Sequence, residues 1–155
     1  MRRAFAVAVT AVILAAAVHA WAAEPLLGTW RLDRQEINGV LTESAPLTLK
    51  VSQSGDRLEF SFSVPVNKVY QVSMSYTLKL DGSEADVKNA QGIKIGTIQM
   101  TPGGASQYKL TLKAPNRPDS SGQLTVSPDG KTLTSEAGTM REGRPTHSKQ
   151  LFSRD

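Results

Sequence analysis

The sequence predicts an all-β protein, an antiparallel up-and-down barrel of about eight to ten strands that follows an N-terminal signal helix. Beyond the leader, no stretch keeps a 3.6-residue apolar period over three turns, and apolar and polar residues instead alternate with period two. Clusters of Gly, Pro, Asn, Asp and Ser interrupt this alternation about every eight to twelve residues. The links are short, which indicates antiparallel neighbours because a parallel crossover needs about a dozen residues.

The first 22 residues have the layout of a secretory signal peptide. Arg2 and Arg3 form a positively charged start, and an apolar run follows at 4–18. The small residues Ala20 and Ala22 then place the cleavage point before residue 23. The alternative is an uncleaved anchor helix, but an apolar run of about 15 residues is shorter than the ~20 that span a bilayer, so cleavage is favoured.

Cleavage leaves residues 23–155 as one domain after the signal peptide at 1–22. We therefore expect an exported bacterial protein, periplasmic or secreted, with no stable membrane anchor after cleavage. A chain of about 133 residues buries roughly two-thirds of its unfolded surface, so a hydrophobic core can form without disulfide bonds or a structural metal. The sequence contains no cysteine, and stability must come from apolar packing and β hydrogen bonds.

The charge of the mature chain gives no sign of nucleic-acid binding. Two of the 18 basic residues, Arg2 and Arg3, lie in the leader, so 16 basic residues face 14 acidic ones. The basic residues are scattered singly, whereas a nucleic-acid footprint needs a basic patch. We therefore exclude nucleic acid as a partner.

The alternation and the turn residues delimit ten strands. A long run at 70–80 places Tyr70, Met74 and Tyr76 on one face, and about 37 Å of strand fits a bent barrel wall better than a small flat sheet. In the run at 93–100 the apolar parity switches at Gly96, which indicates a bulge or a sharp bend. In chain order, the expected strands are 28–37, 47–53, 57–64, 70–80, 85–89, 93–100, 107–113, 122–127, 131–138 and 146–154.

A β-sandwich is the competing all-β architecture. An immunoglobulin-type sandwich would carry its tryptophan on the third strand, between paired cysteines. Here Trp30 lies on the first strand and the chain has no cysteine. The barrel is therefore favoured.

Three short motifs resemble those of lipocalins and their calycin relatives, and most closely small exported bacterial lipocalin-like proteins. They are the Leu-Gly-Thr-Trp opening at 27–30, the SPDGKTLT hairpin at 127–134 and the final LFSR at 151–154. The resemblance implies a closed barrel whose interior can hold a small apolar molecule. It also implies a structural closure by Gly28, Trp30 and Arg154, in which the arginine lies across the indole.

The chain also departs from the family pattern. A Thr-Asp-Tyr segment is missing from the sequence, and no helical pattern precedes the last strand. The stretch 33–46 is too short for the helical pair that lids fatty-acid-binding proteins. A deep, lidded pocket is therefore not expected.

The sequence offers no convergent set of catalytic residues, and we expect no enzyme. His147 is the one histidine of the mature chain, with no thiol and no Gly-x-Ser-x-Gly elbow. A lone histidine without cysteine also argues against a zinc site. Asp81, Glu84 and Asp86 lack EF-hand spacing, so we expect neither a metal nor a cofactor.

Aromatic and apolar residues on shared strand faces are the best functional candidates. The face is either a packed core or the lining of a cavity, in which tyrosine hydroxyls and adaptable methionine suit a mostly apolar ligand. We favour a cavity that binds a small apolar or amphipathic molecule. The candidate ligand-binding residues are Phe60, Phe62, Tyr70, Met74, Tyr76, Tyr108 and Leu110.

The alternative function is a protein-interaction module, an inhibitor or envelope accessory, with a filled barrel. It is suggested by the proline-rich loop at 114–120, whose tip could insert into a protein partner. Interior volume separates the two hypotheses. A void of several hundred cubic ångströms favours the ligand binder, and a packed interior favours the module.

Overall fold

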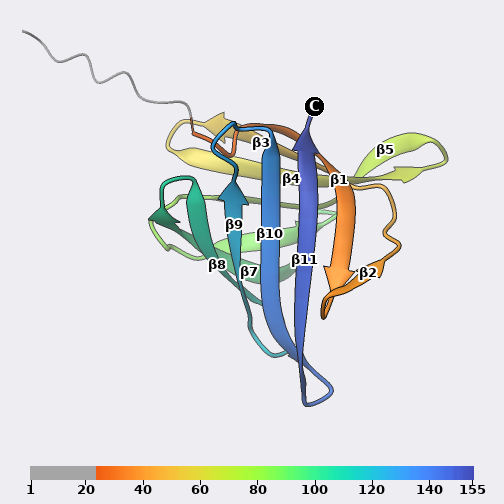
Figure 1. The fold of residues 1–155 in the computed structure, drawn as a ribbon. Coiled ribbons are helices and arrows are strands. Elements are labelled where there is room, and N and C mark those ends of the chain that lie inside the picture. The colour runs from red at the N-terminus through yellow and green to blue at the C-terminus, as the bar shows by residue number, and fades with distance from the viewer. Residues whose placement is uncertain (1–23) are drawn as a thin grey trace, which may run out of the picture.

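The computed structural model describes residues 24–155, which form eleven antiparallel strands and contain no helix long and apolar enough to span a membrane (Figure 1). The predicted signal peptide at 1–22 and its helix lie outside the described residues. The strands are β1 (Gly28–Ile37), β2 (Val40–Thr42), β3 (Thr48–Ser54), β4 (Arg57–Val66), β5 (Val69–Leu78), β6 (Ala85–Asn89), β7 (Lys94–Gly104), β8 (Gln107–Lys113), β9 (Ser120–Val126), β10 (Thr132–Arg141) and β11 (Arg144–Arg154).

Ten of the strands close into a barrel. Neighbours in sequence pair from β3 to β11, and β1 pairs with both β3 and β11, so the sheet returns to its first strand. The predicted all-β, antiparallel up-and-down barrel is therefore confirmed. The eleventh strand, β2, pairs only with the far half of β1, where β1 extends beyond its pairing with β3.

The short strand β2 was not among the expected strands. It has three residues, and its two apolar ones, Val40 and Leu41, are adjacent and exposed, so no alternation marks it. Asn38 and Gly39, both with positive φ, turn the chain from β1 into β2. Local turn chemistry, not burial, therefore forms this strand.

A bulge in β5 overturns part of the face predicted for the long strand. Phe62 pairs with Met74 but Ser63 pairs with Val72, so Ser73 is the extra residue, and its hydroxyl donates to the Phe62 carbonyl at 3.1 Å. Because a bulge reverses parity, Tyr70 and Val72 leave the inner face. Tyr70 is 52% exposed, and its predicted inward orientation is wrong.

The bulge expected at Gly96 is confirmed on β7. Val87 pairs with Gly96 and Lys88 with Lys94, so Ile95 is unmatched. A Cβ on Gly96 would lie 2.3 Å from the Lys113 carbonyl oxygen, too close for any side chain. The absent side chain lets β7 approach β8 at this corner of the barrel.

The barrel has two distinct ends. Strands alternate in direction, so the start of β1, the C-terminus and the β3–β4, β5–β6, β7–β8 and β9–β10 links lie at one end, which we call the closed end (Figure 1). The β1–β2, β4–β5, β6–β7, β8–β9 and β10–β11 links lie at the other, the open end. The sixteen buried apolar residues form one cluster inside the wall, so residues 24–155 contain a complete core of their own.

Candidate functional site

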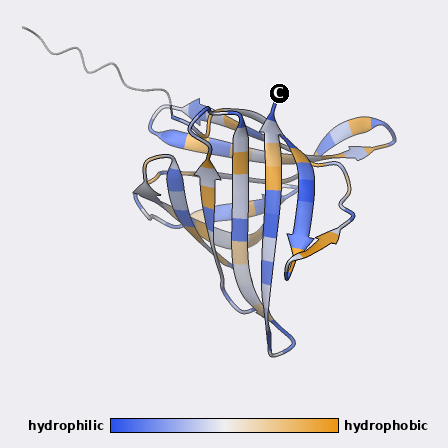
Figure 2. Cartoon of the chain, viewed as in Figure 1, coloured by the Kyte–Doolittle hydropathy of each residue, from blue (hydrophilic) through white to orange (hydrophobic). Residues whose placement is uncertain are grey.

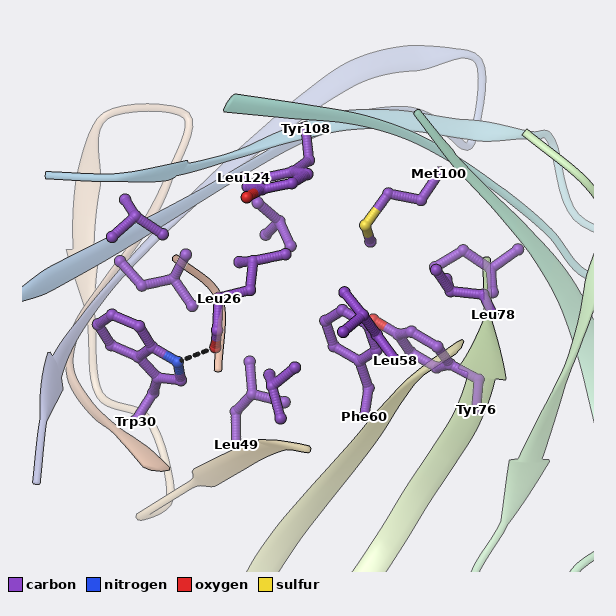
Figure 3. Close-up of a cluster of buried hydrophobic side chains, with 14 of the residues drawn as sticks. Leu26, Trp30, Leu49, Leu58, Phe60, Tyr76, Leu78, Met100, Tyr108 and Leu124 are labelled. Carbon is purple, nitrogen blue, oxygen red and sulfur yellow. Dashed lines mark hydrogen bonds between the residues drawn. The ribbon is translucent and has the colours of Figure 1, made fainter. Parts of the chain in front are cut away.

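The closed end is plugged by Trp30, which is fully buried. Its indole Nε1 donates to the Leu26 carbonyl at 2.9 Å, and Leu26 is itself fully buried (Figure 3). The hydrogen bond satisfies the one polar atom of the indole, so the ring can fill the barrel end without a desolvation penalty. Residues ahead of β1 thus fold back over the end of the barrel.

The Arg154 side chain packs against Trp30 from outside the barrel. Its guanidinium lies 4.2 Å from the centre of the Trp30 ring. Nε donates to the Gly130 carbonyl at 2.6 Å, Nη1 to that of Leu27 at 2.6 Å and Nη2 to that of Pro25 at 2.9 Å. One side chain therefore ties together the N-terminal segment, the β9–β10 turn and the last strand.

Gly28 leaves room for this arginine. Its φ of +137° is strained for any residue with a side chain, and a Cβ there would meet Arg154 Nη1 at 2.8 Å. The three residues expected to form a structural closure therefore lie together, with Arg154 against both Trp30 and Gly28.

Tyr108 also belongs to the closed end. Its hydroxyl donates to the Glu24 carboxylate, which joins β8 to the N-terminal segment. Burial, with the adjacent Glu24 carboxylate, raises the pKa of Tyr108 well above its usual range. Tyr108 therefore stabilises the closed end of the barrel.

A cavity of about 210 Å³ lies inside the middle of the barrel. Its walls are almost wholly apolar and carry no charged residue. At this size it exceeds the ~150 Å³ engineered cavity that stays dry and binds benzene, but it is smaller than the ~300 Å³ at which typical drug-sized sites begin. The lining residues are Leu49, Phe62, Met74, Tyr76, Val87, Ile98, Leu110, Leu112, Leu124, Leu133, Ser135, Gln150 and Phe152.

The polar groups of the cavity are gathered on one wall. Ser135 on β10 and Gln150 on β11 are cross-strand partners, and Gln150 Nε2 donates to the Gln35 side chain on β1 at 3.4 Å. The facing wall, on β4, β5 and β8, presents Phe62, Met74 and Leu110. The cavity therefore offers an apolar volume with one neutral hydrogen-bonding side.

Aromatic rings pack together at the wall of the cavity that contains Tyr76. Phe60 and Tyr76 stack with ring centres 4.7 Å apart (Figure 3). Phe62 lies tilted, with its ring centre 5.9 Å from that of Tyr76. Phe60 is buried but does not line the cavity. Burial raises the pKa of Tyr76 well above its usual range, so the phenol stays neutral.

The seven predicted ligand-binding residues divide into three groups. Phe62, Met74, Tyr76 and Leu110 line the cavity together. Phe60 and Tyr108 are buried away from it, and Tyr70 lies outside the barrel. The residues that sequence reasoning did not select include Ser135 and Gln150, although both follow the inward parity of Leu133 and Phe152. Strand parity could have identified them.

His147 does not approach the cavity. It is exposed near the open end, where its backbone N–H donates to Asn38 Oδ1 at 2.8 Å. Within residues 24–155, no three His, Cys, Asp or Glu side chains form a group able to hold a metal ion.

The raised tyrosine pKa values predict a stability loss in alkaline solution. An unfolded tyrosine ionises near pH 10, whereas folded Tyr76 and Tyr108 stay protonated, so unfolding releases protons above that pH. The stabilisation is complete below pH 10 and should fall by roughly 1–3 kcal/mol between pH 8 and pH 11, as measured by urea unfolding. Tyr76→Phe should weaken this dependence, and an unchanged dependence in that variant would contradict the assignment.

The solved structures that resemble the chain include the following three. Zebrafish ileal bile acid-binding protein complexed with cholic acid has a TM-score of 0.60 and 17% identity, covering 84% of this chain and 99% of that one. A secretory abundant heat soluble protein from Ramazzottius varieornatus has a TM-score of 0.58 and 14% identity, covering 87% and 98%. An S-type phycobiliprotein lyase from Guillardia theta has a TM-score of 0.56 and 11% identity, covering 85% and 89%.

Comparison by sequence gives no match. No family model matches the chain, and no curated protein matches it either. At 11–17% identity the structural likeness concerns the fold alone, and at that level it agrees with the predicted closed barrel.

Proposed function

We propose that this chain, a lipocalin-like barrel of the calycin type, is an exported, non-catalytic protein that binds a small apolar or amphipathic molecule in its interior cavity. The observation that carries the proposal is the cavity of about 210 Å³ with apolar walls and a single polar side. The void is smaller than the several hundred cubic ångströms expected for a ligand binder, but a barrel packed solid would leave no space of this size, which disfavours the alternative of a filled barrel. The leader pattern at 1–22 supports export.

The chemistry of the walls defines the class of ligand. An ionised group without a partner is costly in an apolar interior, and the cavity offers no opposite charge. Ser135 and Gln150 can exchange hydrogen bonds with a neutral hydroxyl, carbonyl or amide. The part of the ligand inside the barrel is therefore uncharged, with at most one or two polar atoms.

Cavity size limits the ligand further. At ~30 Å³ for each water in the liquid, the cavity corresponds to roughly seven waters. A single ring or a short chain of about ten heavy atoms fits this volume without expansion. A much larger ligand would have to widen the barrel or extend out of the open end.

The proposal is tested by calorimetric titration with neutral single-ring and short-chain alcohols, from benzyl alcohol to octanol. We expect at least one of them to bind with a roughly micromolar Kd and to raise the Tm. Native mass spectrometry of gently purified protein would show a natural ligand as added mass. Empty protein in every preparation, together with no heat of binding across the panel, would refute the proposal.

A further inference from the structure

Every exposed large apolar side chain among residues 24–155 lies near the open end of the barrel. We define the open rim as segments 38–47, 64–72, 88–95, 113–120 and 139–146, which contain the five links at that end. Figure 2 shows apolar residues on β2 and on the projecting β4–β5 hairpin. The exposed apolar residues are Val40, Leu41, Val66, Val69, Tyr70, Val72, Ile93, Ile95 and Met140.

The open rim is also the basic part of the molecule. Its segments hold seven basic and three acidic residues, whereas the rest of residues 24–155 holds nine basic and eleven acidic ones. Lys94 and Lys113 form ion pairs with Asp86 and Glu84. The other five basic residues of the rim form no ion pair within residues 24–155: Lys68, Lys88, Arg117, Arg141 and Arg144.

Two pairs of like charges face each other directly on the rim. Arg141 pairs with Arg144 across the β10–β11 hairpin, and Lys88 pairs with Lys94 across β6 and β7. Like charges directly opposite each other on a sheet are destabilising. Asp86 already forms an ion pair with Lys94, whereas Arg141 and Arg144 have no acidic partner within residues 24–155, so an anionic partner would relieve the repulsion at the β10–β11 hairpin.

The hairpins of the rim are tight. Asn67 and Lys68 both have positive φ, as do Glu142 and Gly143, which is typical of two-residue type I′ turns. In the β6–β7 link, Asn89 Oδ1 accepts hydrogen bonds from the backbone N–H groups of Gln91 and Ile93. The backbone of such turns is already ordered, so it loses little conformational entropy when the rim docks.

From these observations we infer that the open rim docks on an anionic lipid surface, with the apolar hairpin side chains inserted among the lipids and the basic residues beside the headgroups. Apolar patches of this kind mark membrane or protein contacts. A protein partner requires a continuous face of roughly 800 Å². Here the apolar side chains stand on four separate hairpins around a mouth, with basic residues between them, which suits a deformable lipid surface better.

Docking would turn the mouth of the barrel toward the lipid. A hollow between the 114–120 loop and the β10–β11 hairpin is lined by Arg117, Arg141 and Leu112, and Leu112 also lines the interior cavity. The inference does not depend on the proposed function, because the rim residues that carry it are not among the residues that line the cavity.

The test is vesicle co-sedimentation of residues 23–155, which include the whole described core and exclude the apolar leader. Vesicles of phosphatidylcholine alone are compared with vesicles of equal parts phosphatidylcholine and phosphatidylglycerol. We expect binding to the anionic vesicles, weakening as salt rises, and little binding to phosphatidylcholine alone.

Matched variants identify the docking face. Lys68→Glu/Arg141→Glu/Arg144→Glu should reduce the partition coefficient by about tenfold or more, since each residue is exposed on the rim. Lys50→Glu/Arg57→Glu/Lys131→Glu changes the net charge equally near the closed end and should retain much more binding. Leu41→Asn/Val69→Asn should also lose about tenfold while the Tm is unchanged, because both residues are more than 60% exposed.

Four results would overturn the inference. They are an absence of binding to anionic vesicles, equal losses in the two triple variants, full binding by Leu41→Asn/Val69→Asn, and rim-dependent self-association without vesicle binding, which would make the rim a protein interface. Ser135→Phe should bind vesicles normally, so failure of the cavity hypothesis and failure of lipid docking give different patterns.

Discussion

Trp30→Ala is expected to lower the free energy of unfolding by about 3–5 kcal/mol, the usual cost of truncating a fully buried tryptophan. The variant would leave a void at the closed end and remove the donor to the Leu26 carbonyl. For a barrel of this length, the Tm should fall by roughly 10 °C or more. Urea unfolding and thermal circular dichroism measure both quantities, and an unchanged Tm would refute the assignment.

Two further variants separate the contributions to this closure. Trp30→Phe keeps most of the ring volume but loses the Nε1 hydrogen bond, so it should cost less than Trp30→Ala. Arg154→Lys keeps the charge but loses the planar fork that reaches the carbonyls of Gly130, Leu27 and Pro25. Because Arg154 is largely exposed, we assign its contact with the indole only about 0.5–1 kcal/mol.

A double-mutant cycle between Trp30 and Arg154 measures that contact directly. Arg154→Ala should lose the three carbonyl hydrogen bonds in either background, whereas the contact with the indole is lost only when Trp30 is present. The coupling energy should therefore be small beside the Trp30→Ala effect itself. Additive effects would mean that the arginine stabilises the closure through its hydrogen bonds alone.

Strand boundaries could be predicted well where alternation is bounded by turn residues. The bounds expected for 28–37, 85–89 and 107–113 agree with β1, β6 and β8 residue for residue. The bulge at Ser73 could not be predicted, because its hydroxyl bonds to the Phe62 carbonyl only after β4 and β5 have paired. A long-range register therefore decided which face Tyr70 presents.

The candidate site could be predicted only in part, for a similar reason. Alternation placed Phe62, Met74 and Leu110 on one inner face, where the structure has them. Whether such a face encloses a void depends on how side chains from ten strands meet across the interior, and period-two patterns carry no such information. The plug residue Leu26 precedes the first strand, so no periodicity marked it.

Filling the cavity should abolish ligand binding without unfolding the barrel. Ser135 lies on the polar wall of β10, and Ser135→Phe would place a ring in a void of about 210 Å³. Because a benzene-sized group already needs a cavity of ~150 Å³, the space that remains is too small for a second ring or a short chain. We expect the affinity for any ligand found by titration to fall by about a hundredfold or more, since most of its contacts would be sterically blocked.

The matched control for this variant is Thr134→Phe, which introduces the same side chain at the neighbouring position on the opposite face of β10. Position 134 pairs with 125 and 151 and does not line the cavity, so ligand affinity should be unchanged there. The stability of Ser135→Phe reflects two opposing effects: filling a void stabilises a core by about 0.5–2 kcal/mol, and a strained rotamer costs about 1–3 kcal/mol. A net change within that range keeps the barrel folded, so lost binding can be attributed to the cavity. If Ser135→Phe instead bound its ligand as tightly as the parent chain, the binding site would have to lie outside the barrel interior.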